Sequence, residues 1–498
     1  MQGLLLRVRR SKFIKVIEAE RTESTTSSEV EGDREGSPPS SPSEPPMKIP
    51  IDVITTERCQ YHPVPWCKRK KRLAVNTVDV LNARRLGYKT RPSGASVCLG
   101  CSYLPNEASC PLGIFSEKMF CGRFSGSGDQ LLTACQDWRI RLYDTRSVYR
   151  WGSKRPQPEH SGEISSRAHH LGDSVLGSSS LRGLPGSKAW EGAPEPLKTI
   201  NCRDVGWSII STDFSPDEKW LAYSSWSHYV HLCNTQGEYE LHEALDFHPV
   251  HQGHFCLFTI QFSPGNTHIL GAGSDKCVHL YSLERKERET CIEAHSGDVN
   301  AVAYTDQGGQ VVISGGDDCV LKVWDLRSPN TAVGGLCGHQ AGVTCITAKG
   351  DGHHLISNSR DQTIKLWDLR KGLDPKDKKL KQAASLPSWD YRWENPVSPP
   401  HTRLADVSIR TFEGHVVRRT LIRCYFSPEH STGQRFIYSG SSDGRVCIWD
   451  LLTGEMERDL SWHQDNTRDV SWHPELPLIA SFSWDRSVGL FGYHAKED

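Results

Sequence analysis

The amino-acid sequence predicts an all-β fold, a seven-bladed β-propeller with a disordered N-terminal extension and two long loop insertions. The first observation is a repeated pattern: residues 293–327 and 335–370 both run from a His through a Ser and an Asp to Trp-Asp-Leu-Arg. The second is its spacing, because Trp324 and Trp367 lie 43 residues apart. A period of about 40–45 residues, with four strand-sized segments in each repeat, is typical of a propeller blade. Because one blade cannot bury both faces of its sheet alone, further copies are expected.

The third observation is that one short spacing recurs along the chain. In each copy a turn residue, usually Asp, stands six positions before the residue that closes a strand-like segment. The seven pairs are Asp137 and Tyr143, Ser227 and Cys233, Asp275 and Tyr281, Asp318 and Trp324, Asp361 and Trp367, Asp443 and Trp449, and Asp485 and Phe491. They predict repeats near 115–146, 200–234, 255–283, 293–327, 335–370, 411–452 and 460–493. The intervals leave two insertions, at 147–198 and 371–410, and we expect the first to be a flexible excursion.

The last repeat has no room for a fourth, outer strand after Phe491. We therefore expect a segment within residues 96–116, upstream of the first repeat, to supply that strand and close the ring. Closure in this way removes two exposed sheet edges at once. The propeller domain would then span residues 95–498, and deletion of residues 95–117 is expected to unfold it.

These repeats resemble those of WD-repeat proteins, in which a His, a Ser, an Asp and a Trp form a buried hydrogen-bonded chain within one blade. A buried carboxylate is tolerated when imidazole and hydroxyl donors pair with it. A Ser-His-Asp hydrolase triad is the alternative, but a nucleophile does not recur once per blade, so a structural role is favoured. The predicted tetrads are His295, Ser314, Asp318 and Trp324; His339, Ser357, Asp361 and Trp367; and His415, Ser439, Asp443 and Trp449.

Composition narrows the class of protein. The net charge of −1 over 498 residues gives no field that would favour nucleic acid or membrane, and neither is an expected partner. No apolar run reaches the length of a membrane-spanning helix, and the first residues do not form a secretory signal. We therefore expect the chain in the nucleus and the cytoplasm, with its 17 cysteines reduced and mostly buried in strands. No cofactor is expected.

Residues 1–94 are expected to be mostly disordered, because 22–47 contain few large apolar side chains. A short helix at 77–86 could bind a partner or simply cover one face of the propeller. A basic run follows the disordered stretch, and it could be a nuclear import signal or a solvated charge run. Its members are Lys68, Arg69, Lys70, Lys71 and Arg72.

A group of cysteines and a histidine near the start of the chain raises the question of a zinc site. Only Cys98 and Cys101 have the spacing of a ligand pair, and one such pair is a weak signal. The sequence therefore favours no metal there. The residues considered are Cys59, His62, Cys67, Cys98, Cys101 and Cys110.

Three repeats carry an Arg two positions after the Asp of the closing box, at Arg146, Arg327 and Arg370. This resembles the Trp-Asp-x-Arg box of substrate receptors for cullin-4 RING ubiquitin ligases. Longer segments, such as CQDWRIRLYDTR, LISNSRDQTIKLWDLR, TLIRCYFSP and RDVSWHP, look like the cullin-4-associated factor eleven family, which has LEC-type relatives in plants. The sixth repeat departs from the pattern, with Leu452 at the Arg position, and the seventh has Gly492 where the Asp of the box would stand.

The resemblance implies a substrate-recognition subunit without chemistry of its own. Such a subunit would bind the adaptor damage-specific DNA-binding protein one, and through it cullin-4 and a RING subunit, and would present unidentified protein substrates for ubiquitination. The residues carried over for adaptor contact are Arg146, Arg327, Arg370, Asp325 and Asp368. An Arg beside an Asp at a strand end could equally pair within its own blade.

Two other classes of function remain to be weighed. A general WD-repeat scaffold in a chromatin or ribonucleoprotein complex would explain the repeats but not the Arg boxes. An enzyme is not supported, because the chain has no phosphate-binding glycine loop, no metalloprotease His pair and no unique nucleophile motif. The sequence does not identify the substrate. Because propellers usually bind partners through the loops around the central channel, the candidates for partner contact are Trp138, Arg203, Trp226, Arg360 and Arg468.

Overall fold

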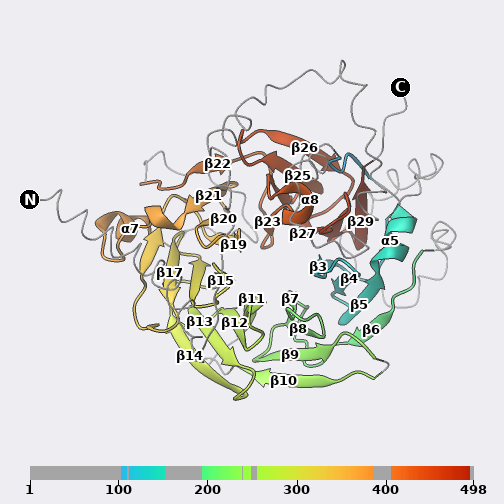
Figure 1. The fold of residues 1–498 in the computed structure, drawn as a ribbon, viewed down its shortest axis with the longest axis horizontal. Helices are drawn as coiled ribbons and strands as arrows, with labels where there is room; N and C mark the ends of the chain where they lie inside the picture. Colours follow the sequence, from blue (N-terminus) through green and yellow to red (C-terminus); the bar gives the residue numbers. More distant parts are fainter. Residues whose placement is uncertain are drawn as a thin grey trace, which may run out of the picture. The chain divides into compact units, whose positions relative to one another are not determined.

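The computed structural model describes residues 103–108, 111–152, 193–237, 239–247, 255–384 and 405–493. The chain divides into two compact units, residues 1–90 and 91–498, and all described residues belong to the second. Within that unit the described strands form seven antiparallel sheets arranged in a ring (Figure 1). The predicted seven-bladed β-propeller is therefore confirmed. The predicted helix at 77–86, the basic run at 68–72, the early cysteines and the expected disorder of residues 1–94 lie outside the described residues.

Each of the first six blades is a meander of four strands, and consecutive strands are hydrogen-bonded neighbours. Blades 1 and 2 contain β3 (Met119–Phe124), β4 (Gln130–Cys135), β5 (Arg139–Asp144), β6 (Lys198–Asn201), β7 (Ser211–Phe214), β8 (Trp220–Ser224), β9 (Tyr229–Asn234) and β10 (His242–Asp246). Blades 3 and 4 contain β11 (Leu257–Phe262), β12 (His268–Gly273), β13 (Cys277–Ser282), β14 (Glu287–Glu293), β15 (Val299–Tyr304), β16 (Val311–Gly316), β17 (Leu321–Asp325) and β18 (Gly334–Leu336). Blades 5 and 6 contain β19 (Val343–Ala348), β20 (His354–Ser359), β21 (Ile364–Asp368), β22 (Arg410–Phe412), β23 (Cys424–Phe426), β24 (Phe436–Gly440), β25 (Arg445–Asp450) and β26 (Met456–Ser461).

Blade 7 takes strands from both ends of the described chain. Its inner strands are β27 (Thr467–Trp472), β28 (Ile479–Ser483) and β29 (Ser487–Gly492). Its outer edge consists of β1 (Glu107–Ala108) and β2 (Gly113–Ile114), which both pair antiparallel with β29. The closing segment thus comes from the stretch upstream of the first repeat that the sequence indicated.

The core lies between neighbouring blades. One buried cluster joins Leu270 and Val278 of blade 3 to Val302 and Trp324 of blade 4. Another joins blades 4 and 5 around Trp367. The strands that supply these clusters are buried on both faces, so their β-branched and aromatic residues run without polar alternation. Since each cluster draws on two blades, the ring is stabilised as a unit and not blade by blade.

Both insertions fall inside a blade, between its third and fourth strands. The first begins with α5 (Thr145–Gly152), where Val148 and Trp151 are buried and the Trp151 Nε1 donates to the Pro111 carbonyl at 2.7 Å. The expectation of a flexible excursion from residue 147 is therefore wrong for 147–152, because these apolar side chains pack on the ring. The second insertion contains η5 (Leu369–Lys371) and α7 (Lys378–Ala383). Residues 153–192 and 385–404 lie outside the described part of the chain.

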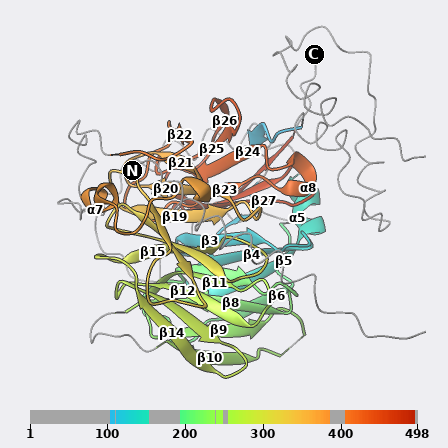
Figure 2. The ribbon, with the colours of Figure 1, turned by 60° about the vertical axis from the view of Figure 1, so that its left-hand side comes forward.

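The helices of the insertions lie at the rim. Figures 1 and 2 place α5 and α7 on different sides of the ring. A fourth short helix, α8 (Glu429–Thr432), follows β23. Across the described segments, no helix combines the length and the apolar character needed to cross a membrane.

Candidate functional site

The two faces of the propeller carry different connections. The turns between the first and second strands, and the loops between the third and fourth, lie on one face, which we call the AB face. The turns between the second and third strands, and the segments that join one blade to the next, lie on the other, the BC face. Because neighbouring strands are antiparallel, every Trp-Asp box at the end of a third strand lies on the AB face.

The Arg boxes of blades 4 and 5 have the same geometry. The Arg327 Nε and Nη2 donate to the two carboxylate oxygens of Asp325 at 3.0 and 2.8 Å. The Arg370 Nε and Nη2 donate to Asp368 in the same way, both at 2.9 Å. Each guanidinium is thus held by a two-point, charge-assisted contact within its own blade. The arginine side chains are still 46% and 48% exposed, so each presents its outer side to solvent.

These ion pairs favour the charged forms of the side chains that make them. The side-chain hydrogen bond from Arg327 lowers the pKa of Asp325. Burial opposes the charged form of Asp368, but hydrogen bonds from Arg370 outweigh it and lower the pKa of this carboxyl as well. The same contact raises the pKa of Arg370. Both boxes therefore present a rigid, fully charged guanidinium at the AB face.

The box of blade 1 does not form this pair. Arg146 is the second residue of α5 and lies exposed on it. Asp144 instead accepts hydrogen bonds from the backbone N–H and the hydroxyl of Ser147, at 3.1 and 2.9 Å, and caps the helix. The box of blade 1 therefore differs in geometry from the other two, because an α-helix begins where blade 4 has a turn and blade 5 a single 3-10 turn. Adaptor contact by Arg146 stays a prediction.

Blade 6 has an Arg–Asp pair that the sequence did not reveal. Its box offers Leu452, which is 72% exposed, at the Arg position. The buried Asp450 is instead contacted by Nε and Nη2 of Arg435 at 2.7 and 2.6 Å. Arg435 precedes Phe436, which pairs with Asp450 in the β24–β25 hairpin, so the donor comes from the neighbouring strand. Blades 4, 5 and 6 thus each carry an Arg–Asp pair on the AB face.

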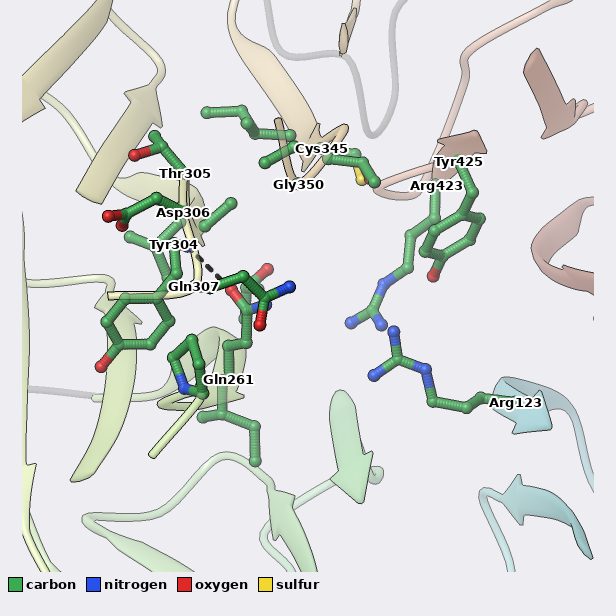
Figure 3. A pocket seen from close by; sticks show the side chains of 18 of the residues that line it. Arg123, Gln261, Tyr304, Thr305, Asp306, Gln307, Cys345, Gly350, Arg423 and Tyr425 are labelled. Atoms are coloured by element: carbon green, nitrogen blue, oxygen red, sulfur yellow. Dashed lines mark hydrogen bonds between the residues drawn. The ribbon is translucent and has the colours of Figure 1, made fainter. Parts of the chain in front are cut away.

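The AB face also opens into two adjoining cavities of about 330 and 470 Å³ around the ring centre. Both are lined by Arg123, at the end of β3, and by Tyr425 of β23. Figure 3 shows the guanidinium groups of Arg123 and Arg423 pointing toward one another and into the smaller cavity, with Gln307 on the opposite side. The sequence did not indicate this site, because its lining comes from the first strands of several blades.

Two like charges at close range repel each other, and two carboxylates offset them. Arg123 forms an ion pair with Asp213, and Arg423 lies 3.8 Å from Asp469. Asp469 also accepts a hydrogen bond from the Tyr425 hydroxyl at 2.8 Å. The guanidinium N–H groups and the side-chain amides that line this cavity can donate hydrogen bonds to an anionic group such as a carboxylate.

The BC face carries a cluster of exposed tryptophans between blades 1 and 2. Trp138, Trp207 and Trp226 are 52%, 48% and 37% exposed. The rings of Trp207 and Trp226 meet edge to face at 6.4 Å, and the Trp138 Nε1 donates to the Trp207 carbonyl at 3.4 Å. Exposed aromatic clusters of this kind are typical of protein-binding surfaces.

The structure brings two of the predicted tetrads together. The His295 Nδ1 lies 2.7 Å from Asp318, its Nε2 lies 2.7 Å from the Ser314 hydroxyl, and the Trp324 Nε1 donates to that hydroxyl at 2.9 Å. The second tetrad repeats this arrangement with corresponding distances of 2.9, 2.7 and 2.8 Å between His339, Asp361, Ser357 and Trp367.

The third predicted tetrad, His415, Ser439, Asp443 and Trp449, does not form. His415 turns to the Asn358 side chain of the preceding blade at 2.8 Å, and Trp449 donates to the Glu413 carbonyl at 3.0 Å. The Ser439 hydroxyl bonds to the Arg423 carbonyl instead. The cause is Arg445, two positions after Asp443, whose guanidinium lies 2.6 Å from that carboxylate. The equivalent residues of the two intact tetrads are Val320 and Thr363, which offer no competing cation.

Blade 7 has a three-membered version that the sequence did not reveal. His463 lies 3.0 Å from Asp485 through Nδ1 and 2.6 Å from the Ser481 hydroxyl through Nε2. Phe491 occupies the Trp position and has no donor. The spacing of His463 and Asp485 can be read from the sequence. Because the Trp of the tetrad pattern is absent, that spacing alone did not indicate a tetrad.

Two buried imidazoles predict a loss of stability in mild acid. Burial lowers the pKa of His415 and of His473 to about 4. Between the unfolded value of about 6.5 and this folded value, only the unfolded chain gains these protons, so stability falls as pH falls. From pH 6.5 to 5 each group should remove about 2 kcal/mol from the free energy of unfolding.

Urea unfolding at pH 6.5 and pH 5 measures this effect. A His415→Gln variant removes one of the two groups, so its pH dependence should be flatter by about 2 kcal/mol over the same interval. The variant provides its own reference, because each protein is compared with itself at two pH values. An equal slope in variant and wild type would contradict the assignment to His415.

Comparisons with known proteins agree with the fold. The family model "WD domain, G-beta repeat" matches residues 247–282, 286–325, 330–368, 406–450 and 454–491. A LEC14B homolog from Prunus armeniaca is 39% identical over 443 residues, which cover 84% of this chain and 82% of that protein. The LEC14B protein of Lithospermum erythrorhizon is 32% identical over 447 residues, covering 86% and 85%.

A "DDB1- and CUL4-associated factor 11 homolog" from Caenorhabditis elegans is 31% identical over 414 residues, which cover 80% of this chain and 64% of that protein. The two plant proteins match over most of their own length, so the relationship is to whole proteins and not only to the repeats. The resemblance drawn from the Arg boxes is thereby confirmed, and the chain belongs to the family of WD-repeat proteins that includes LEC14B and the DDB1- and CUL4-associated factor 11 homologs.

Proposed function

We propose that this chain is the substrate-recognition subunit of a cullin-4 RING ubiquitin ligase. In this role it binds the adaptor damage-specific DNA-binding protein one and presents protein substrates for ubiquitin transfer, without catalysis of its own. The names of relatives from Caenorhabditis elegans and Caenorhabditis briggsae, both "DDB1- and CUL4-associated factor 11 homolog", support this assignment. A general WD-repeat scaffold is the alternative, and adaptor binding distinguishes the two.

The observation that carries the proposal is the set of Arg–Asp pairs on the AB face of blades 4, 5 and 6. Arg327, Arg370 and Arg435 are held against Asp325, Asp368 and Asp450, and they remain 46%, 48% and 34% exposed. A guanidinium that is already fixed in place loses little side-chain entropy when a partner binds it. We therefore assign adaptor contact to this edge of the AB face.

Substrate is then assigned to the BC face, where Trp138, Trp207 and Trp226 are exposed. Tryptophan is enriched among the residues that carry most of the binding energy at protein interfaces. With the adaptor on the AB face and the substrate on the BC face, neither partner obstructs the other.

Capture of the purified adaptor tests the proposal. Wild-type protein should retain it, and an Arg327→Ala/Arg370→Ala/Arg435→Ala variant should bind at least about ten-fold more weakly, because interface arginines often contribute more than 1.4 kcal/mol each. Arg445→Ala is the matched control, since Arg445 also forms ion pairs with Asp443 and Asp459 but lies on the BC face. Circular dichroism and melting temperature establish that each variant folds.

The outcomes separate the alternatives. Capture by wild type and by Arg445→Ala, with loss in the triple variant, supports both the receptor function and the docking edge. Equal capture by all three proteins keeps the receptor function and moves docking elsewhere. If the folded wild-type protein fails to capture the adaptor, the receptor proposal is wrong and the scaffold remains.

A further inference from the structure

Blade 3 gathers two thiols, a carboxylate and an imidazole at the BC end of its outer strands. Cys277 and His279 are two residues apart in β13, so their side chains lie on the same face of the sheet. His279 is the register partner of Cys291 in β14, so the Cys291 side chain lies on that face as well. Asp275 comes from the turn just before β13. The ligating atoms of Asp275, Cys277 and Cys291 all lie within 4.8 Å of one another.

This cluster is not a variant of the tetrad. The position of the tetrad serine, four residues before the Asp, is Gly271 in blade 3. Asp275 is contacted at 3.0 Å by His279, which comes from the third strand of the same blade. The two thiols have no counterpart in the intact tetrads, where Val320 and Thr363 occupy the position of Cys277. The structural role of the tetrad therefore does not account for this set of residues.

Space for the cluster depends on Gly273. A Cβ at this position would lie 2.3 Å from the Asp275 carboxylate and 3.0 Å from the His279 Nε2. The backbone at Gly273 does not have a positive φ, so backbone conformation does not require glycine here. The missing side chain instead leaves room for the carboxylate and the imidazole.

The chemistry of these donors is that of a soft or borderline metal ion. Two thiolates and a carboxylate carry three negative charges, and such sets bind divalent ions of the zinc class in tetrahedral geometry. His279 is fully buried, and its contact with Asp275 orients the carboxylate, as hydrogen-bonded neighbours of metal ligands commonly do. Cys277 is buried and the Asp275 side chain is only 5% exposed, while Cys291 is half-buried and gives the cluster its access from solvent.

We propose that Asp275, Cys277 and Cys291 form a binding site for one zinc-class divalent cation, with His279 positioning Asp275. A bound ion would link β13 to β14, the outermost strand of blade 3, and would stabilise the folded state by mass action. The inference is independent of the proposed ligase function. It concerns a site on the BC half of a blade that carries neither an Arg box nor the tryptophan cluster.

Cobalt(II) titration of the full chain, stripped of metal and fully reduced, is the test. Wild-type protein should develop the visible absorption bands of tetrahedral cobalt–thiolate coordination, and zinc should displace them. Cys277→Ser and Cys291→Ser should each lose one equivalent of bound cobalt with those bands. His279→Gln should retain the bands but bind about 10–100-fold more weakly, because it removes only the orienting contact.

Cys202→Ser is the matched control, since Cys202 is a half-buried free thiol outside the cluster, and it should bind cobalt like wild type. The early cysteines are present in every variant, so the measured quantity is the one equivalent that separates Cys291→Ser from wild type. The same stoichiometry in wild type and Cys291→Ser overturns the proposal. Cys291 is half-buried, so its replacement should leave the melting temperature of the metal-free protein unchanged.

Discussion

Replacing Asp361 with alanine should lower the free energy of unfolding by about 3–5 kcal/mol, the cost of removing one partner from a buried charged network. The Asp361 side chain is only 6% exposed, and it accepts hydrogen bonds from the His339 ring, the Gln340 N–H and the Thr363 hydroxyl. Burial opposes its charged form, yet His339 and the hydrogen bonds from Gln340 and Thr363 together outweigh burial and lower the pKa of Asp361 to about 2. The alanine variant leaves all of these donors without their acceptor, and that loss is the source of the large effect.

Asp443 provides the matched comparison, because it occupies the same position in the next blade. Its side chain is 36% exposed and its partner is the guanidinium of Arg445, not a buried imidazole. Asp443→Ala should therefore cost less than about 1 kcal/mol, the usual range for an exposed ion pair.

Urea unfolding of both variants at pH 7, followed by circular dichroism, measures the difference. The sequence alone would assign the same large cost to both positions, so the experiment also tests the structure against the pattern. Similar losses at Asp361 and Asp443 would show that the third tetrad forms after all. A small loss at Asp361 would show that the buried network contributes little.

The fold could be predicted from the sequence because it depends on spacing. Seven copies of one six-residue interval, from a turn residue to the residue that closes a strand, suffice to give seven blades, whatever residues fill the strands between them. Ring closure could be predicted for a similar reason, since a last repeat without an outer strand must find one elsewhere.

The candidate site could be predicted only in part, because side-chain partners compete in three dimensions. Asp443 has the pattern of a tetrad member, but Arg445 is a stronger partner than an imidazole and takes its place. Arg435 reaches Asp450 across a hairpin, so no box around Trp449 could indicate it.

The same limit applies to the other two sites. Cys277 and Cys291 lie on the same face of adjacent strands as diagonal neighbours, and their separation in the chain follows no known ligand-pair spacing. The central cavities collect side chains from the first strands of several blades, which are far apart in sequence. Spacing rules detect neither arrangement, because both depend on strand pairing and ring closure.

The largest effect on stability is expected at the closing segment. Deletion of residues 95–117 removes β1 and β2, which leaves β29 as an unpaired edge and exposes the clusters on either side of it. Backbone hydrogen bonds to Val488, Arg486 and Gly492 are lost as well. We expect the truncated chain to lose its cooperative melting transition, because every blade depends on its neighbours in the ring.

Point variants separate side-chain burial from simple chain shortening. Leu104 and Leu112 are only 4% and 3% exposed and pack into two different clusters of blade 7 and its neighbours. Leu104→Ala and Leu112→Ala should each cost about 2–5 kcal/mol, the usual range for a large-to-small change in a core. Ile114→Ala is the control in the same segment, since Ile114 is 59% exposed, and it should change stability by less than about 0.5 kcal/mol.

Thermal melting of the deletion and of the three point variants decides whether the segment closes the ring. Effects at Leu104 and Leu112 but not at Ile114 would identify burial of this segment as the force that holds blade 7 together. Because the two leucines pack on opposite sides of β29, their double variant should lose about the sum of the single effects. A deletion variant that melts at the wild-type temperature would mean that three strands complete blade 7 and that ring closure has another origin.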